Sequence, residues 1–312
     1  MNYSRQELYW GKKNQTTIQK ATVTIVGVGA LGTFSAELLC RTGVRKLIII
    51  DRDRIEESNL QRQILYDHDD VGKWKAEVAA EKMKKSNPNV QIEFHITDLN
   101  HHNSSLLNGI ILDCTDNLST RRLINEYCKK NKMPWIYSAC IRDYGNVMSI
   151  LPQGPCFNCV FGDAETNETC DTVGIVNTAV GVIASMAVTE VIKIIIGKSD
   201  SILLSYNVWS HSFSQITPKK NDACSVCNGK YEYLSGKYAQ KIITYCGSNQ
   251  YQFRLPRFDY NEVLRKFSSY NIKKGPSYFF VDSLAIFNDG RVVVKAENEQ
   301  RAKAILSKFF GL

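Results

Sequence analysis

Residues 25–32 read IVGVGALG and place Gly27, Gly29 and Gly32 in the pattern G-x-G-x-x-G. An apolar run, ATVTIV, leads into this stretch, a helix-like run follows it, and a second apolar run, KLIII, ends on Asp51. In a strand–helix–strand unit the glycines allow a tight turn and a close approach to phosphate, while the acidic residue binds ribose hydroxyls. The stretch therefore predicts a nucleotide site, but the same physics serves NAD, FAD and ATP.

Strand-like and helix-like runs alternate along the first half of the chain. This pattern predicts an α/β fold with a Rossmann-like, largely parallel sheet and helices on both faces. The further strands are expected at 90–96, 109–115, 134–140 and 145–151, and the helices at 74–87 and 118–131. A long helix is expected next, at 175–197, followed by antiparallel strands at 202–208 and 211–217. Two domains are predicted, 1–229 and a small α+β domain at 230–312.

Four of the ten cysteines form two C-x-x-C pairs, Cys156 with Cys159 and Cys224 with Cys227. Four thiolates are the ligand set of a tetrahedral structural zinc site in a reducing compartment. The alternative is a redox-active C-x-x-C pair, which two matched pairs flanked by Gly or Pro make less favourable. The sequence therefore predicts a zinc site that the fold assembles from two distant segments.

The composition is typical of a soluble globular protein, with 44% hydrophobic and 22% charged residues. The first residues, MNYSRQELYWGKKNQ, contain no apolar core of signal-peptide length, so a cytoplasmic location is expected. The most apolar stretch, 179–197, contains Glu190 and Lys193. It is therefore expected to form a buried core helix, with no membrane association.

The positive charge is concentrated near the C-terminus. Residues 230–312 hold 14 Lys and Arg against 7 Asp and Glu, whereas 1–229 are nearly balanced. The excess could attract an acidic protein or RNA, or be an ordinary solvated surface. Because no compact basic block or aromatic-basic motif appears, direct nucleic-acid binding is not expected. We expect residues 230–312 to dock an acidic partner protein.

Four polar segments accompany the glycine loop: YSRQ at 3–6, SNLQRQ at 58–63, VGKWK at 71–75 and DCTDN at 113–117. They supply Arg and Lys donors and a carboxylate at the end of a strand. A nicotinamide site needs few of these cationic donors and no such carboxylate for a metal. A triphosphate attacked at its α-phosphate needs cations against the developing charge and a carboxylate for magnesium.

With these segments, the sequence resembles the ThiF/MoeB/HesA family, adenylyltransferases related to ubiquitin-activating enzymes. The resemblance covers about residues 3–228 and rests on YSRQ, GVGALG, the Asp51 strand end, SNLQRQ, VGKWK, LDCTDN, both C-x-x-C pairs and TCDTVGIV, in the family's order. It implies ATP-dependent adenylation of the C-terminal glycine carboxylate of a ubiquitin-like sulfur-carrier protein ending in Gly-Gly, with release of pyrophosphate. The product would serve thiocarboxylate formation or conjugation.

The resemblance also implies roles for individual residues. The glycine loop would hold the phosphates, Asp51 the ribose and Asp116 a magnesium ion. Phosphate contacts are implied for Asn59, Arg62 and Lys75. Lys73 is the nearby competitor of Lys75, which is favoured because the family's lysine lies three residues after the VG pair.

Three further roles implied by the resemblance concern residues outside this cluster. Arg5 would reach the partner subunit's site, implying a homodimer, and the four paired cysteines would hold zinc. Cys170, in the loop 163–174, would be the thiol that links covalently to the activated carrier. Cys246 is a weaker candidate for a second acceptor thiol. A separate sulfur donor protein is implied because no rhodanese-like domain is present.

Each of these residues also has a simpler interpretation. Asp51 could be a turn or cap residue, Arg62 a surface charge, and Arg5 a flexible terminal charge. Asp116 could form an Asx turn before the next helix, and Cys170 could be an incidental loop cysteine.

Other functions remain open at this point. A NAD-dependent dehydrogenase shares the glycine loop but leaves SNLQRQ, VGKWK and the cysteine pairs unexplained. A relative that adenylates a small-molecule or tRNA-linked carboxylate generally lacks the cysteine pairs. A non-catalytic subunit of a heterodimeric activating enzyme should have lost phosphate-binding residues that are present here.

Overall fold

The computed structural model describes residues 1–162, 173–238, 243–245, 250–255, 258–268, 270–275 and 278–310. The chain divides into two compact units, Met1–Tyr238 and Ala239–Leu312. Residues 230–238 lie with the first unit, because the Glu126 carboxylate accepts hydrogen bonds from the backbone N–H of Glu232 and Leu234, at 3.1 and 2.8 Å.

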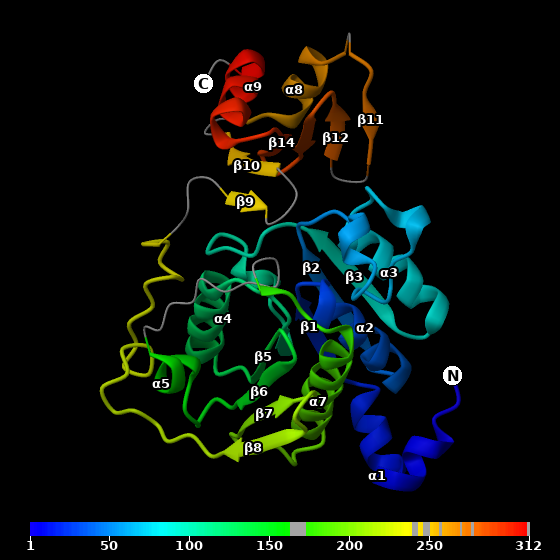
Figure 1. The fold of residues 1–312 in the computed structure, drawn as a ribbon, viewed down its shortest axis with the longest axis vertical. Helices are drawn as coiled ribbons and strands as arrows, with labels where there is room; N and C mark the ends of the chain where they lie inside the picture. The colour runs from blue at the N-terminus through cyan, green and yellow to red at the C-terminus, as the bar shows by residue number, and fades with distance from the viewer. Residues whose placement is uncertain are drawn as a thin grey trace. The chain divides into compact units, whose positions relative to one another are not determined.

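The first unit contains an eight-stranded mixed sheet (Figure 1). Its strands are β1 (Thr22–Val26), β2 (Lys46–Asp51), β3 (Gln91–Ile96), β4 (Ile110–Asp113), β5 (Trp135–Ile141), β6 (Tyr144–Ile150), β7 (Leu203–Asn207) and β8 (Ser212–Ile216). In the order β3-β2-β1-β4-β5-β6-β7-β8, the first five strands are parallel and the last three run antiparallel to their neighbours. The expected Rossmann-like sheet with an antiparallel continuation is confirmed.

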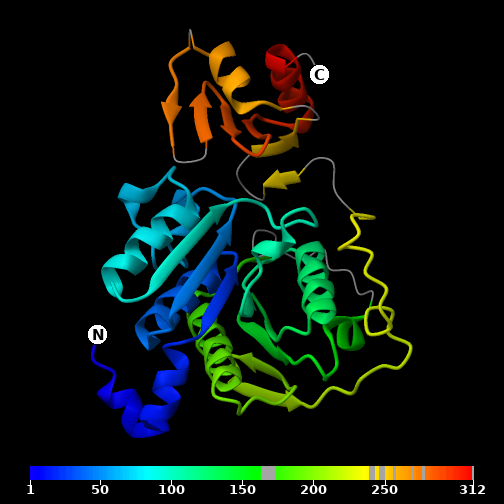
Figure 2. The same cartoon turned by 180° about the vertical axis from the view of Figure 1, so that it is seen from behind.

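Helices cover both faces of this sheet (Figure 2). They are α1 (Ser4–Ile18), α2 (Ala30–Thr42), α3 (Lys75–Ser86), α4 (Leu118–Asn131), α5 (Phe157–Phe161) and α7 (Asn177–Ile195), with short 3-10 helices at Glu57–Asn59, His68–Asp70 and Ser104–Leu106. Helix α2 packs against α3 and α7, while Leu123 and Ile124 of α4 join a buried cluster with strand residues such as Ile50. Helix α1, which no apolar pattern predicted, bends at Gly11, where φ is +83°.

Helix α7 is long and apolar enough to cross a membrane, a criterion that core helices of globular proteins also meet. In this structure it packs against α2, β5 and β6. Ala179, Ile183, Ala187 and Val191 recur at intervals of four and are fully buried, which is the pattern of a helix with one face on a sheet.

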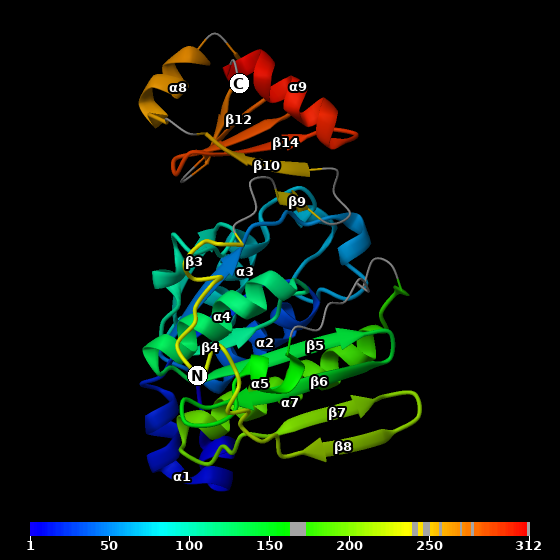
Figure 3. The ribbon, with the colours of Figure 1, turned by 90° about the vertical axis from the view of Figure 1, so that its left-hand side faces the viewer.

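The second unit is a six-stranded antiparallel sheet in the order β11-β12-β13-β14-β10-β9. The strands are β9 (Ile243–Tyr245), β10 (Gln250–Arg254), β11 (Lys273–Lys274), β12 (Tyr278–Val281), β13 (Leu284–Phe287) and β14 (Arg291–Lys295), and the helices are α8 (Tyr260–Lys266) and α9 (Glu299–Phe310). Figure 3 shows both helices on one face of this sheet. Phe267, Phe279 and Leu306 are buried in the core between them.

The first sheet has a switch point between β1 and β4, where the direction of strand progression reverses. In open parallel sheets this is where ligands bind, beyond the carboxyl ends of the strands. The glycine loop follows β1 and the segment 113–117 follows β4. The fold thus brings two of the predicted functional segments to one place.

Candidate functional site

The glycine loop is packed so tightly at Gly27 and Gly32 that a side chain would not fit at either position. A Cβ on Gly27, where φ is +88°, would lie 2.9 Å from the Cys114 carbonyl oxygen, and a Cβ on Gly32 would lie 1.9 Å from that of Gly27. Gly29 is the N-cap of α2 and has no side chain with which to cap the helix. The first N–H groups of α2 are therefore presented to whatever occupies the loop, as in phosphate-binding helix termini.

Asp51 ends β2 and anchors this loop. Its carboxylate accepts hydrogen bonds from the backbone N–H of Val28 and Asp53, both at 2.7 Å. Burial and the neighbouring Asp53 charge raise the pKa of Asp51 from 3.8 to about 6, against the opposing effect of Lys75. Each carboxylate oxygen still has a lone pair for a ligand hydroxyl, so Asp51 can both hold the loop and bind a sugar.

Lys75 begins α3 and lies against the same carboxylates. Its Nζ is 3.2 Å from Asp53 Oδ2, and the residue is only 7% exposed. Burial would lower the pKa of Lys75, but the negative charges of Asp53, Asp51 and Asp116 raise it. Lys73 instead points to Asp70, 3.1 Å away, with a half-exposed side chain.

Tyr66 connects the loop to α3. Its hydroxyl lies 2.8 Å from the carbonyl oxygen of Val28 and 3.1 Å from that of Lys75. Asp53 and Tyr66 were missed by sequence reasoning. For Asp53 the available signal was a second aspartate two residues after Asp51. Nothing in the sequence marked Tyr66.

The Asp116 loop is fixed by a buried ion pair behind it. Asp113, fully buried, accepts hydrogen bonds from the Thr115 N–H at 3.0 Å and from Arg121 Nε at 3.1 Å. Arg121 Nη2 also donates to the carbonyl oxygens of Thr115 and Ser138. Asp116 itself is exposed at the tip of the loop. Arg121 was also missed, although a charged residue on the buried face of a predicted helix was a visible signal.

The SNLQRQ segment lies over the glycine loop. Asn59 is buried and its Oδ1 accepts a hydrogen bond from the Glu56 N–H at 3.2 Å, so its side chain caps a 3-10 helix. Arg62 Nη1 donates to the Ser58 carbonyl oxygen at 2.9 Å. The Gln63 amide nitrogen is 3.8 Å from the position that a Cβ on Gly29 would occupy. The segment thus places polar side chains beside the N-terminus of α2.

Two predicted site residues are not part of this cluster in the described chain. Arg5 is exposed on the first turn of α1, and no described contact joins it to the glycine loop or to Asp116. Cys170 falls in 163–172, which lie outside the described residues, as does Cys246.

The four paired cysteines come together in one cluster. All four sulfur atoms lie within 4.8 Å of one another. The Sγ–Sγ distances are 3.8 Å for Cys156–Cys159, 3.6 Å for Cys156–Cys224 and 3.5 Å for Cys159–Cys227. A tetrahedral zinc with bonds of about 2.3 Å requires sulfur separations of about 3.8 Å. The cluster therefore fits a tetrahedral metal ion.

Helix α4 connects the Asp116 loop to this cluster. Near its start Arg121 holds the loop, and one turn later Asn125 Oδ1 accepts a hydrogen bond from the Phe157 N–H at 2.9 Å. At its end Lys129 Nζ donates to the Pro152 carbonyl oxygen at 3.0 Å. Helix α4 packs against β5 (Figure 3). One helix thus positions both candidate centres.

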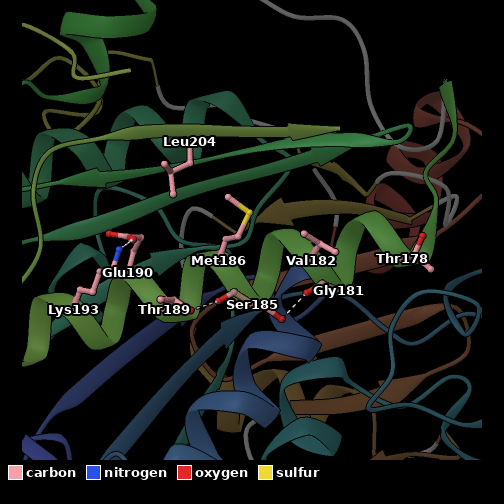
Figure 4. Close-up of a pocket in the computed structure, with 9 residues that line it drawn as sticks. All are labelled: Thr178, Gly181, Val182, Ser185, Met186, Thr189, Glu190, Lys193 and Leu204. Atoms are coloured by element: carbon pink, nitrogen blue, oxygen red, sulfur yellow. Dashed lines mark hydrogen bonds and ion pairs between the residues drawn. The ribbon is translucent and has the colours of Figure 1, made fainter. Parts of the chain in front are cut away.

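A groove of about 650 Å³ runs along α7 (Figure 4). Its lining is mostly apolar, and the hydroxyls of Ser185 and Thr189 donate to helix carbonyl oxygens one turn back, at 2.7 and 2.8 Å. Glu190 accepts hydrogen bonds from Ser149 at 2.9 Å and from Lys193 at 2.6 Å. None of the groups described above lines this groove. It is therefore separate from the nucleotide cradle, which we define as the glycine loop with Asp51, Gln63, Lys75 and the Asp116 loop.

Several known proteins are similar to this chain. The sulfur carrier protein ThiS adenylyltransferase of Bacillus subtilis is 33% identical, over 99% of both chains. The SAMP-activating enzyme E1 of Haloferax volcanii is 31% identical over 70% of this chain and 84% of its own length.

Among solved structures, E. coli MccB with MccA-N7isoASN has a TM-score of 0.66 at 24% identity, covering 72% of this chain and 74% of that one. This likeness concerns the fold alone. Residues 3–226 match the ThiF family. Because that match covers most of the chain, and a relative is 33% identical over nearly all of it, the chain belongs to the ThiF family.

Proposed function

We propose that this chain uses ATP to adenylate the C-terminal glycine carboxylate of a ubiquitin-like sulfur-carrier protein. The observation that carries the proposal is the grouping at the switch point. Asp51 holds the glycine loop that leads into α2, and the charges of Asp51 and Asp116 act on Lys75. The names of the Bacillus and Haloferax relatives support the choice of substrate.

In the proposed reaction, a carboxylate oxygen of the carrier attacks the α-phosphorus of ATP. A phosphorus–oxygen bond forms, the bond to the bridging oxygen breaks, and pyrophosphate leaves with that electron pair. No redox change occurs. The chain's own contribution is positioning and charge neutralisation, for which a buried cation such as Lys75 suits the phosphates.

The chain would hold two metal ions. Asp116 would ligate Mg²⁺, because an exposed carboxylate on a rigid loop at the strand end is free to take a hard cation. Bound Mg²⁺ would offset charge on the phosphate oxygens. The cysteine cluster would hold a structural Zn²⁺, whose thiolate ligands favour a reducing compartment such as the cytoplasm.

Asp51 would bind the ribose hydroxyls, and Asn59 and Arg62 would contact the phosphates. Of these, Asn59 has its amide already engaged in capping, so its contact requires the remaining lone pair or N–H.

We further propose a homodimer in which Arg5 enters the site of the second copy. Leu8 and Tyr9, about one turn after Arg5 in α1, are 80% and 88% exposed, as expected for a segment that packs against a partner. Cys170 would accept the activated carrier after adenylation: its thiolate would attack the acyl carbon, a carbon–sulfur bond would form, and AMP would leave. A separate protein would supply sulfur.

The test is carrier-dependent exchange of pyrophosphate into ATP, measured with a panel of small ubiquitin-like proteins ending in Gly-Gly. Exchange with one carrier that Asp116→Ala lowers by at least about a hundredfold, and that Cys170→Ala retains, would support adenylation before thiol chemistry. The matched control is Asp69→Ala, an exposed acidic residue outside the cradle, which should keep full exchange.

Absence of exchange with every carrier, despite ATP binding, would contradict the proposal. That result would favour a small-molecule or tRNA-linked carboxylate, or a non-catalytic subunit of a heterodimeric activating enzyme.

A further inference from the structure

Gln63 has an unsatisfied side chain at the edge of the nucleotide cradle. The residue is only 3% exposed, and its Oε1 has no hydrogen-bond partner within the described parts of the chain. Its backbone is fixed, because its N–H donates to the Asn59 carbonyl oxygen at 3.0 Å and its own carbonyl oxygen accepts from the Tyr66 N–H at 3.1 Å. The backbone of Gln63 is thus anchored, while its Oε1 has no partner among the described residues.

An unpaired carboxamide in a buried position costs free energy, because it has lost water without gaining a protein partner. A methionine of the same length would fill the space without that cost. A buried unsatisfied group of this kind calls for an explanation outside the core.

The direction of the amide supplies that explanation. Its nitrogen faces Gly29, lying 3.8 Å from the Cβ position there, and Gly29 is the N-cap of the 13-residue helix α2. With Oε1 turned inward, the two N–H groups of Nε2 are directed to the side where the helix terminus attracts anions. A neutral donor is thereby added to the backbone N–H groups of the loop.

We infer that Gln63 is a substrate-contacting residue, whose Nε2 donates a hydrogen bond to a phosphate oxygen of ATP bound at the N-terminus of α2. The inference rests on the proposed function, since it takes ATP as the ligand. Gln63 contributes geometry without charge. It therefore complements the cation Lys75, and its contact persists at any pH at which the protein is folded.

The experiment uses the full-length chain and three variants. Gln63→Met removes the amide at constant length, and Gln63→Glu keeps an acceptor but replaces the donor by a negative charge. Ser199→Ala is the control, because the Ser199 hydroxyl is also buried and without a partner among the described residues. It follows the far end of α7, a helix of 19 residues or about 28 Å whose first residue contacts Gln61.

We expect Gln63→Met to keep or raise the Tm of the nucleotide-free protein while weakening Mg-ATP binding about tenfold in titration calorimetry. Gln63→Glu should weaken binding further, because its carboxylate faces the phosphates. Ser199→Ala should leave the Kd unchanged. If Gln63 had only a structural role in the core, Gln63→Met would change the Tm and leave the Kd for Mg-ATP unchanged.

Unaltered Mg-ATP affinity in Gln63→Met, with normal binding by the parent chain, would overturn this inference and leave the proposed function standing. Failure of the parent chain itself to bind Mg-ATP would overturn the proposed function, and the inference with it. The affinity of Gln63→Glu serves as a second test, since a donor contact cannot survive that change.

Discussion

The cysteine cluster and the nucleotide cradle are assembled in different ways. The cluster takes four identical ligands from two short segments, and its sulfur atoms already lie at distances that a metal ion requires. The cradle takes different groups from separate segments, and several of them are engaged with one another. Lys75 is paired with Asp53, and Asp51 holds the backbone of Val28.

The difference follows from what each centre would bind. A structural metal stays bound and forms part of the fold, so its ligands can be permanently arranged around one point. A nucleotide must enter and leave. Internal ion pairs such as Lys75–Asp53 keep buried charges neutralised while the site is empty. Mutations in the cysteine cluster should therefore lower the stability of the fold. Mutations in the nucleotide cradle should instead lower the affinity for nucleotide and the reaction rate.

The largest effect is expected for Cys224→Ser, which removes one of the four ligands. Metal content should fall from about one zinc per chain to nearly none, and the Tm should fall by at least about 10 °C, because metal binding is part of the folding free energy. Cys140→Ser, outside the cluster, should keep its zinc. A variant of Cys224 with full zinc and an unchanged Tm would show that the cluster is not a metal centre.

The next largest effect is expected for Arg121→Gln, behind the Asp116 loop. It leaves Asp113 buried without its ion-pair partner, a loss of about 3–5 kcal/mol in the free energy of unfolding measured with urea. Lys73→Gln removes a half-exposed lysine from buried Asp70, which keeps Lys82 as a second partner. This change should cost less than about 1 kcal/mol.

The double variant Arg121→Gln with Asp113→Asn should recover part of the stability lost by Arg121→Gln, because no charge is then left unpaired. Equal costs at Arg121 and Lys73 would remove the distinction between a buried cation and a half-exposed one.

A smaller effect is expected from pH at Asp51. Its pKa in the folded protein, about 6, lies above its ordinary value of 3.8. The folded state therefore keeps a proton that the unfolded chain has released between about pH 4 and pH 6. The stability that this proton contributes is complete below about pH 4 and is lost as the pH rises through about 6.

The variant Asp51→Asn has no titratable group at this position. As the pH rises from about 4.5 to about 6.5, its free energy of unfolding should therefore increase by about 1–2 kcal/mol relative to that of the parent protein. Urea unfolding of both proteins at these two pH values measures the difference in their free energies of unfolding. A difference that stays constant with pH would show that the pKa of Asp51 is not raised by its position in the cradle.

The smallest effect is expected from removing the second unit, residues 239–312. We expect the KM for an acidic carrier to rise about threefold to tenfold, because the basic residues of this unit would no longer attract it. The Kd for ATP should not change, since the cradle lies in the first unit. The difference in KM should diminish at high salt, and an unchanged KM at low salt would argue against a docking role.

Much of the fold was predictable from local patterns. The alternation of apolar runs predicted β1 to β6 and α2 to α4, because buried strands and amphipathic helices have distinct periods. Helix α1 was not predicted, since it is largely polar and interrupted by Gly11. The two-residue strand β11 has no apolar pattern of its own, because it exists only through its pairing with β12.

The candidate site was predictable only in part. The glycine loop and the cysteine pairs have fixed spacings that reflect the geometry of a turn or a metal, so they can be recognised in sequence. No fixed spacing marks the roles of Arg121, Tyr66 and Asp53. Each acts through a contact that forms only when the chain folds, with Asp113, Val28 and Lys75 respectively.

The sequence by itself determined the fold class, the cysteine set and the family resemblance, since each is encoded in short-range spacing and periodicity. Only the tertiary structure decided that Lys75 lies with Asp53 whereas Lys73 lies with Asp70. It also decided that Gln63 is buried beside Gly29. The physical reason is that burial and pairing depend on how strands and helices pack, and residues two positions apart in sequence can then meet different neighbours.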